Sequence, residues 1–323
     1  MTIDYQRVLA LDIPAVEHSY TQRDAMLYAL GLGLGSDPLD SAQLRYVYEQ
    51  NLQVFPTMPV VLALVSMRAI DLGIDCTKLV HGEQELVLHA PLRTAGTIIG
   101  KTRVTEIVDR GAGKGALIYL AREVKDKANG TLLATSTMSV FCRADGGFGG
   151  PVTGAPAPYK LPDREPDAVH DISTLPQQAL IYRLSGDFNP LHAEPAVARA
   201  AGFERPILHG LATFGIVARA LVAGPLAGNG ARLASLAGRF TAPVLPGETI
   251  RVEIWNEGDI YGLRAKSLAR DAVVFDYGRA TQNPVTTLQG ISASASRLAS
   301  VAKKPTASSE ECTVRVIRCD SKT

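Results

Sequence analysis

One short polar stretch brings together an acid, an amide and a base. Residues 182–192 read YRLSGDFNPLH and include Asp187, Asn189 and His192. Histidine is the side chain that most readily exchanges a proton near neutral pH, and a nearby carboxyl group can serve as its partner. The stretch could therefore perform general acid–base chemistry on one small molecule. The same residue types also occur in purely structural turns, which is the alternative interpretation.

The elements predicted around this stretch favour chemistry over a plain turn. Gly186 lets the chain leave an apolar helix predicted at residues 174–184, and Pro190 holds the residue before it extended. Downstream, His209 and Gly210 open a long apolar helix predicted to run to residue 222. Helix N-termini carry unpaired N–H groups and partial positive charge, which suit an oxygen that becomes negative, such as that of a thioester enolate.

A weak internal repeat divides the chain into two copies. The segment AMLYAL at residues 25–30 corresponds to ALIYRL at residues 179–184, an offset of 179 − 25 = 154. At this offset Gly33 stands opposite Asp187 and Gly35 opposite Asn189, and no histidine follows nearby. A structural loop should keep its polar residues in both copies. We therefore predict that the second copy catalyses and that the first shapes a pocket.

Each copy is predicted to combine apolar helices with a strand-rich region. A single sheet with one helix on one face leaves an edge and an open face, so two units should join. In the first copy we expect a helix capped by Thr21, a buried helix at 59–72, and strands at 85–89, 96–108, 116–125 and 131–143. In the second we expect a further short helix at 195–201 and strands at 232–241, 249–256, 261–268 and 272–280.

The predicted domain boundaries follow the repeat. We expect an N-terminal domain at 1–143, a Gly/Pro-rich linker at 144–165 and a catalytic domain at 166–282. A mostly disordered tail should follow at 283–323, with one short strand near 313–317. A homodimer is compatible with this organisation, although the joined copies already supply two units.

Composition excludes several other classes of protein. Hydrophobic residues make up 46% of the chain, enough for a large core, and the net charge of +1 argues against nucleic acid as the main partner. No apolar run approaches the ~20 residues of a membrane span, and the start lacks a signal pattern. The cysteines are scattered, which indicates neither zinc nor disulfides and fits a reducing compartment: Cys76, Cys142, Cys312 and Cys319. We expect a cytoplasmic protein, or a peroxisomal one in a eukaryote.

Residues 182–215, YRLSGDFNPLHAEPAVARAAGFERPILHGLATFG, resemble the hydratase 2 motif of the MaoC-like family. The first copy resembles the non-catalytic half of the two-domain members, and the resemblance spans roughly residues 5–282. It implies an α+β double hot-dog fold, in which two long central helices are wrapped by curved antiparallel sheets that join. It also implies reversible hydration of trans-2-enoyl-CoA to (3R)-3-hydroxyacyl-CoA, with acyl-CoA as the small-molecule partner and no metal or redox cofactor.

The resemblance also assigns roles to individual residues. Asp187 and His192 would hold one water, with His192 as the base and Asp187 delivering a proton to C2. Asn189 would orient them, and the Gly210 N–H would hold the thioester oxygen. The remaining predicted substrate-binding residues are Ser185, Gly186, Pro190, His209, Arg183 and Arg205, of which the arginines, together with Arg199, could meet the phosphates of coenzyme A.

Three other functions remain open at this stage. They are a dehydratase acting on a branched, dicarboxylic or carrier-bound thioester, a thioesterase, and a non-catalytic acyl-CoA-binding module. The glycines at 31–35 follow a helix rather than a strand, which argues against a dinucleotide site. The histidines outside the motif lack ligand spacing and are predicted to be structural: His18, His81, His89 and His170.

Overall fold

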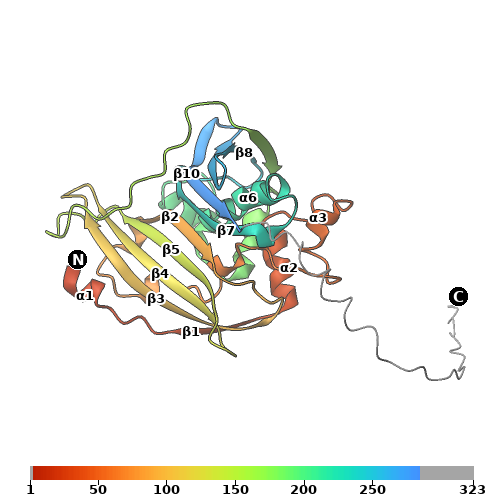
Figure 1. The fold of residues 1–323 in the computed structure, drawn as a ribbon. Coiled ribbons are helices and arrows are strands. Elements are labelled where there is room, and N and C mark those ends of the chain that lie inside the picture. Colours follow the sequence, from red (N-terminus) through yellow and green to blue (C-terminus); the bar gives the residue numbers. More distant parts are fainter. Residues whose placement is uncertain (1–2, 284–323) are drawn as a thin grey trace, which may run out of the picture. The chain divides into compact units, whose positions relative to one another are not determined.

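Ten strands form one antiparallel sheet in the computed structural model, which describes residues 3–283 (Figure 1). The strands are β1 (Val16–Tyr20), β2 (Leu79–Leu88), β3 (Gly96–Asp109), β4 (Ala116–Asp126), β5 (Leu132–Cys142), β6 (Ala168–Ser173), β7 (Leu233–Phe240), β8 (Thr249–Asn256), β9 (Ile260–Ser267) and β10 (Ala272–Gln282). Their order in the sheet is β1-β3-β4-β5-β2-β7-β10-β9-β8-β6. The predicted joined sheet of a double hot-dog is confirmed.

The helices are short, with one exception. They are α1 (Tyr5–Leu9), α2 (Gln22–Gly31), α3 (Ser41–Leu44), α4 (Gln178–Tyr182), α5 (Pro195–Ala200) and α6 (Gly210–Ala223). Single 3₁₀ turns are η1 (Met58–Val60), η2 (Met67–Ala69), η3 (Cys76–Lys78), η4 (Arg183–Ser185), η5 (Pro190–His192) and η6 (Gly230–Arg232). The predicted Thr21 cap is confirmed, because its side chain and that of Asp24 form a reciprocal capping box.

The two halves of the sheet are related by an internal two-fold axis. Read outwards from the centre, β2-β5-β4-β3-β1 repeats as β7-β10-β9-β8-β6. The two central strands pair antiparallel where the halves meet, with Glu85 opposite Ala237 and Glu83 opposite Arg239. Helices α2 and α4 also contact each other. Figure 1 shows β2 and β7 between the yellow strands of the first half and the blue strands of the second.

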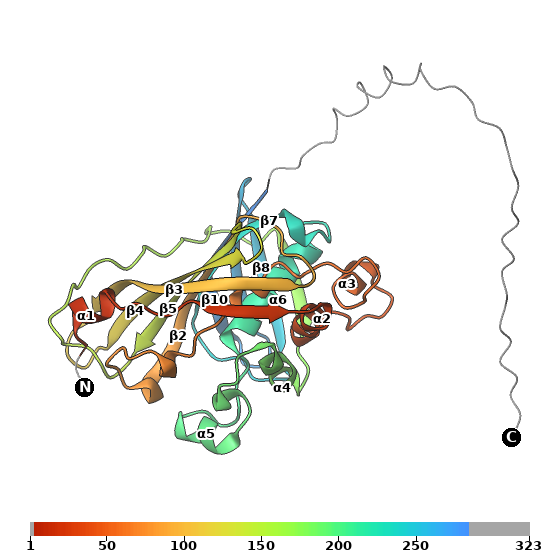
Figure 2. The ribbon, with the colours of Figure 1, turned by 90° about the horizontal axis from the view of Figure 1, so that it is seen from below.

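Helix α6 is the central helix of the second half. It is apolar on nearly every side, and 11 of its 14 residues are buried. Such a helix must lie inside the fold rather than on its surface, and α6 contacts β2, β6, β7 and β8. In Figure 2, α5 instead projects away from the sheet. The buried α6 therefore fixes where its N-terminus, Gly210, lies.

The helix predicted at residues 59–72 is wrong. The chain forms only the turns η1 and η2 there, and Ala63 takes a left-handed conformation with φ 52°. The buried guanidinium of Arg122 donates to the carbonyl oxygen of Val60 at 2.6 Å, so a side chain replaces a helical hydrogen bond. A continuous apolar run does not distinguish a helix from a buried irregular segment, and Pro59 lacks an N–H.

The edge strands β1 and β6 were not predicted, because their residues are short, polar runs exposed on alternate positions. Residues 144–165 contain neither helix nor strand, in keeping with the expected linker. The exact domain limits, the homodimer and the compartment stay predictions. The tail after residue 283 and its strand near 313–317 lie outside the described residues. Across residues 3–283, every helix is too short or too polar to cross a membrane.

Candidate active site

The structure brings Asp187 and His192 together with a third side chain, His209. One ligand atom from each of the three lies within 4.8 Å of the others. Asp187 comes from the loop after η4, His192 ends η5, and His209 caps the N-terminus of α6. The predicted acid–base pair is therefore adjacent in space, and the histidine that was predicted only to bind substrate belongs to the same cluster.

Local backbone chemistry shapes the loop that carries Asp187 and His192. Gly186 has φ 121°, a conformation that side chains disfavour, and it turns the chain away from η4. Pro190 is the first residue of η5, where a missing N–H costs little. The exposed Asn189 accepts a hydrogen bond at Oδ1 from the N–H of Leu191, at 3.1 Å. In this structure Asn189 therefore holds the loop in shape.

His192 is poised as a neutral base. Its ring is 8% exposed, and Nδ1 lies 2.9 Å from the carbonyl oxygen of Ile207. Because a carbonyl oxygen only accepts, Nδ1 carries the proton and Nε2 keeps a free lone pair. Burial lowers the pKa of His192, and the hydrogen bond to Ile207 and the charge of Asp187 oppose that shift. The imidazole is consequently unprotonated at neutral pH.

His209 stacks on His192 and fixes the loop behind it. The two ring centroids lie 3.7 Å apart at an interplanar angle of 26°. Nε2 of His209 donates to the backbone oxygen of Asp187 at 3.1 Å. Burial, followed by the neighbouring His192, holds the pKa of His209 well below its usual value. His209 thus stays neutral and ties the acid-bearing loop to the start of α6.

Gly210 is the first residue of α6, as predicted. The first N–H groups of a helix have no partner within it, so the Gly210 N–H is free for a ligand oxygen. A Cβ at this position would lie 3.3 Å from Cε2 of Phe240, a tight contact. The absence of a side chain therefore preserves space beside the donor.

Residues of the first half also lie beside the loop and the start of α6. A Cβ on Gly186 would lie 3.7 Å from the backbone oxygen of Val61. The ring of His81, at the start of β2, packs edge-on against Phe240 with centroids 4.9 Å apart. Sequence reasoning missed Val61 and Phe240 and treated His81 as structural. The β2–β7 pairing brings His81 to Phe240, and the segment after η1 brings Val61 to Gly186, and no local sequence motif predicts either contact.

Several buried polar atoms around the cluster lack a partner among the described residues. They are Tyr182 OH, Arg183 Nε, Ser185 Oγ and His209 Nδ1. Buried polar atoms in proteins are nearly always hydrogen-bonded, to water or ligand if not to protein. Four such atoms at residues 182–185 and 209 are consistent with water or a polar ligand group close to the cluster. The predicted substrate-binding positions Arg183 and Ser185 therefore lie at the site.

The predicted coenzyme A contacts are less well assembled. Arg183 places its guanidinium 5.0 Å from the ring centroid of Phe188. Arg199 and Arg205 are exposed, and among the contacts of the described residues none joins either of them to the cluster. Their role with the phosphates stays a prediction.

A metal ion is a second use for an Asp–His–His cluster, and the 4.8 Å spacing would allow one. Metal ligands must converge on one point about 2 Å from each donor atom. The stacked rings of His192 and His209 lie in nearly parallel planes, so their in-plane lone pairs do not readily meet at one point, and a backbone oxygen already engages one nitrogen of each ring. The arrangement therefore suits proton transfer better than metal binding.

Comparison with known proteins adds independent information. A family model described as "MaoC like domain" matches residues 159–274, and one described as "MFE-2 hydratase 2 N-terminal domain" matches residues 18–144. The chain is 43% identical over 258 residues to 3-hydroxyacyl-thioester dehydratase Y of Mycobacterium tuberculosis, covering 79% of this chain and 88% of that one.

Two further relatives agree with these matches. The peroxisomal enoyl-CoA hydratase 2 of Arabidopsis thaliana is 37% identical, covering 78% of this chain and 86% of its own. The crystal structure of a MaoC-like dehydratase from Phytophthora capsici superposes with a TM-score of 0.77 at 34% identity, covering 86% of this chain and 98% of that one.

Proposed function

The chain belongs to the MaoC-like dehydratase family, and we propose that it hydrates trans-2-enoyl-CoA reversibly to (3R)-3-hydroxyacyl-CoA. The enzyme class is a hydro-lyase, in line with relatives named enoyl-CoA hydratase and dehydratase. The relatives support hydration of an enoyl thioester at the family level. The stereochemistry and the residues that carry the reaction are the proposal.

The observation that supports the proposal most directly is the position of the neutral His192. It lies beside Asp187 and beside His209, the residue that precedes the N-terminus of α6. His192 Nε2 withdraws a proton from a bound water as the water oxygen bonds to C3. The resulting imidazolium passes this proton to the carboxylate of Asp187, which delivers it to C2, so that both residues end in their starting protonation states. Water is thereby added across the double bond with no net change in the enzyme.

The Gly210 N–H stabilises the thioester oxygen while negative charge develops on it. The thioester itself acidifies C2, so this chemistry requires neither a metal nor a redox cofactor. His209 keeps the loop and the helix start in register through its hydrogen bond to Asp187. Asn189 acts indirectly, by holding the η5 turn.

The direct test follows the loss of enoyl-thioester absorbance with crotonyl-CoA and trans-2-decenoyl-CoA, with chiral analysis of the product. Asp187→Asn and His192→Ala should each lower kcat by at least about 10²-fold, the usual contribution of a general acid or base. Asp259→Asn and His170→Ala are matched controls away from the cluster and should retain full activity. Wild-type rates in either cluster variant would refute the assignment.

The same preparation separates the alternatives. Release of free thiol, detected with a thiol reagent, would indicate a thioesterase instead. A (3S) product would contradict the proposed geometry of attack. Turnover of only branched or carrier-bound thioesters would change the proposed substrate class but not the proposed roles of Asp187 and His192.

A further inference from the structure

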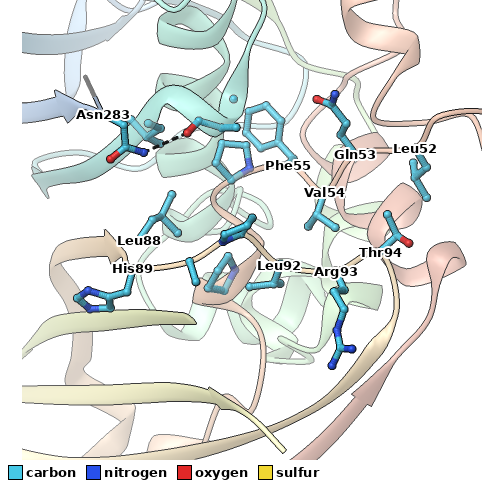
Figure 3. Close-up of a pocket in the computed structure, with 17 residues that line it drawn as sticks. Leu52, Gln53, Val54, Phe55, Leu88, His89, Leu92, Arg93, Thr94 and Asn283 are labelled. Carbon is cyan, nitrogen blue, oxygen red and sulfur yellow. Dashed lines mark hydrogen bonds between the residues drawn. The ribbon is translucent and has the colours of Figure 1, made fainter. Parts of the chain in front are cut away.

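A cavity of about 380 Å³ lies away from the Asp187–His192–His209 cluster (Figure 3). It is lined by residues 52–56, Pro59, residues 88–94, Gly230, Ala231, Leu233 and Asn283. In Figure 3, Val54, Phe55 and Leu88 point towards the hollow, while His89 and Arg93 point outwards. Its volume falls in the range of small-molecule sites, which are typically apolar with a few polar groups.

The cavity and the catalytic cleft lie at opposite ends of the β2–β7 pair. His81 and Phe240 border the cleft at one end, whereas Leu88 and Leu233 line the cavity at the other. Seven residues of strand separate His81 from Leu88, and at ~3.3 Å per residue the two sites are roughly 20 Å apart. The cavity is therefore distinct from the proposed active site.

The internal two-fold axis exchanges these two places. The Ala90-Pro91 and Ala242-Pro243 dipeptides are related by an offset of 242 − 90 = 152, which makes Phe240 the counterpart of Leu88 and Leu233 the counterpart of His81. The sequence repeat has an offset of 154, and contacts in the structure recur between residues related by the same offset. Two contacts between the halves are exchanged by this offset: Gly186 lies against Val61, and Leu32 lies against Gly215, with 186 − 32 = 154 and 215 − 61 = 154.

At this second offset the start of α6 has its counterpart in the wall of the cavity. Gly210 corresponds to Pro56 and His209 to Phe55, and both counterparts line the hollow. The cavity therefore occupies, in the first half, the position that the catalytic cleft occupies in the second.

Every catalytic group is missing from this counterpart. Pro56 has no N–H, so the donor supplied by Gly210 is gone. Phe55 cannot form the hydrogen bond made by His209, and Gly33 and Gly35 stand where Asp187 and Asn189 stand. The chain after Pro56 forms the 3₁₀ turn η1 instead of a long helix, which also removes the positive helix end. What remains is a mainly apolar cavity that is large enough for a small molecule but lacks the counterparts of the proposed catalytic groups.

We infer that this cavity is a second, non-catalytic site that binds the acyl chain of an acyl thioester. The identity of the thioester rests on the proposed function, whereas the existence of the hollow and its symmetry do not. An acyl chain suits its mainly apolar lining, and the lining contains no counterpart of Asp187, His192 or the Gly210 N–H, so the bound acyl chain stays unchanged. Each chain would thus hold one reacting thioester and one retained thioester.

Calorimetric titration of the full-length protein with decanoyl-CoA, which has no double bond to hydrate, tests this inference. We expect two sites per chain for decanoyl-CoA. Separate titrations with decanoate and with coenzyme A alone show whether the acyl chain or the nucleotide part of the thioester accounts for binding. Ala90→Phe, which adds a ring at the cavity wall, should leave one site, and Ala242→Phe, at the symmetric position, should leave the other.

A second measurement avoids reliance on variants that fail to fold. Wild-type protein is irradiated with decanoyl-CoA carrying a photoreactive group at the end of its chain, and modified peptides are mapped by mass spectrometry. Labelling of residues 52–59 or 88–94, in addition to the catalytic cleft, is expected. One site per chain with labelling of the cleft alone would overturn the inference. Two sites without enoyl-CoA hydration would instead refute only the proposed function.

Discussion

Replacing Gly210 by proline isolates the backbone donor that the proposed mechanism requires. Proline is favoured at the first position of a helix, because the N–H it lacks has no partner within the helix. The residue before it, His209, has φ −59° and ψ 138°, an extended conformation that a following proline accepts. Gly210→Pro should therefore keep α6 intact while removing the N–H and placing a ring carbon where the thioester oxygen would approach.

Alanine at the same position is the matched control. Its Cβ meets the same ring, 3.3 Å from Cε2 of Phe240, but the N–H remains. Loss of one oxyanion donor costs about 10²–10³ in kcat, or about 2.7–4 kcal/mol. We therefore expect Gly210→Pro to be about 10²–10³-fold slower than Gly210→Ala on trans-2-decenoyl-CoA, with similar unfolding midpoints for the two variants. A ratio of kcat values below about threefold would refute the role of the Gly210 N–H.

Three further predictions concern pH and packing. Because burial lowers the pKa of His192, the acidic limb of log kcat/KM against pH should lie below the usual histidine value of 6.5, and a limb at or above 6.5 would contradict His192 as the base. His209 is also held neutral in the fold, so its contribution to stability is lost as the pH falls below 6.5, where the unfolded chain binds more protons. In urea unfolding between pH 7.5 and 5.5, His209→Asn should flatten this loss by up to about 1.4 kcal/mol per pH unit, and an unchanged slope would argue against a neutral His209. Gly215→Ala would place a Cβ 2.4 Å from Cδ2 of the buried Leu32 and should lower the free energy of unfolding by about 1–3 kcal/mol; no change would mean that the two halves pack more loosely there than the structure indicates.

The amino-acid sequence alone was enough to predict the candidate catalytic stretch and a division of roles between the two halves. Asp187, Asn189 and His192 lie close together in the chain, so proline and glycine chemistry was enough to predict one shared loop. The repeat predicted that the first half lacks these groups. The predicted strands and α6 followed from apolar and β-branched runs between turn residues, and the structure contains them.

Tertiary structure alone decided what surrounds that loop. His209 stacks on His192 from 17 positions along the chain, since 209 − 192 = 17, and His81 reaches Phe240 only through the register of β2 with β7. Contacts of this kind depend on strand pairing, which no local pattern encodes. The irregular segment after Pro56 was likewise decided by Arg122, whose side chain replaces a helical hydrogen bond from a distant strand. The sequence thus predicted which groups react, while long-range contacts determined the residues around them, the hydrogen bond that sets the tautomer of His192, and the second cavity.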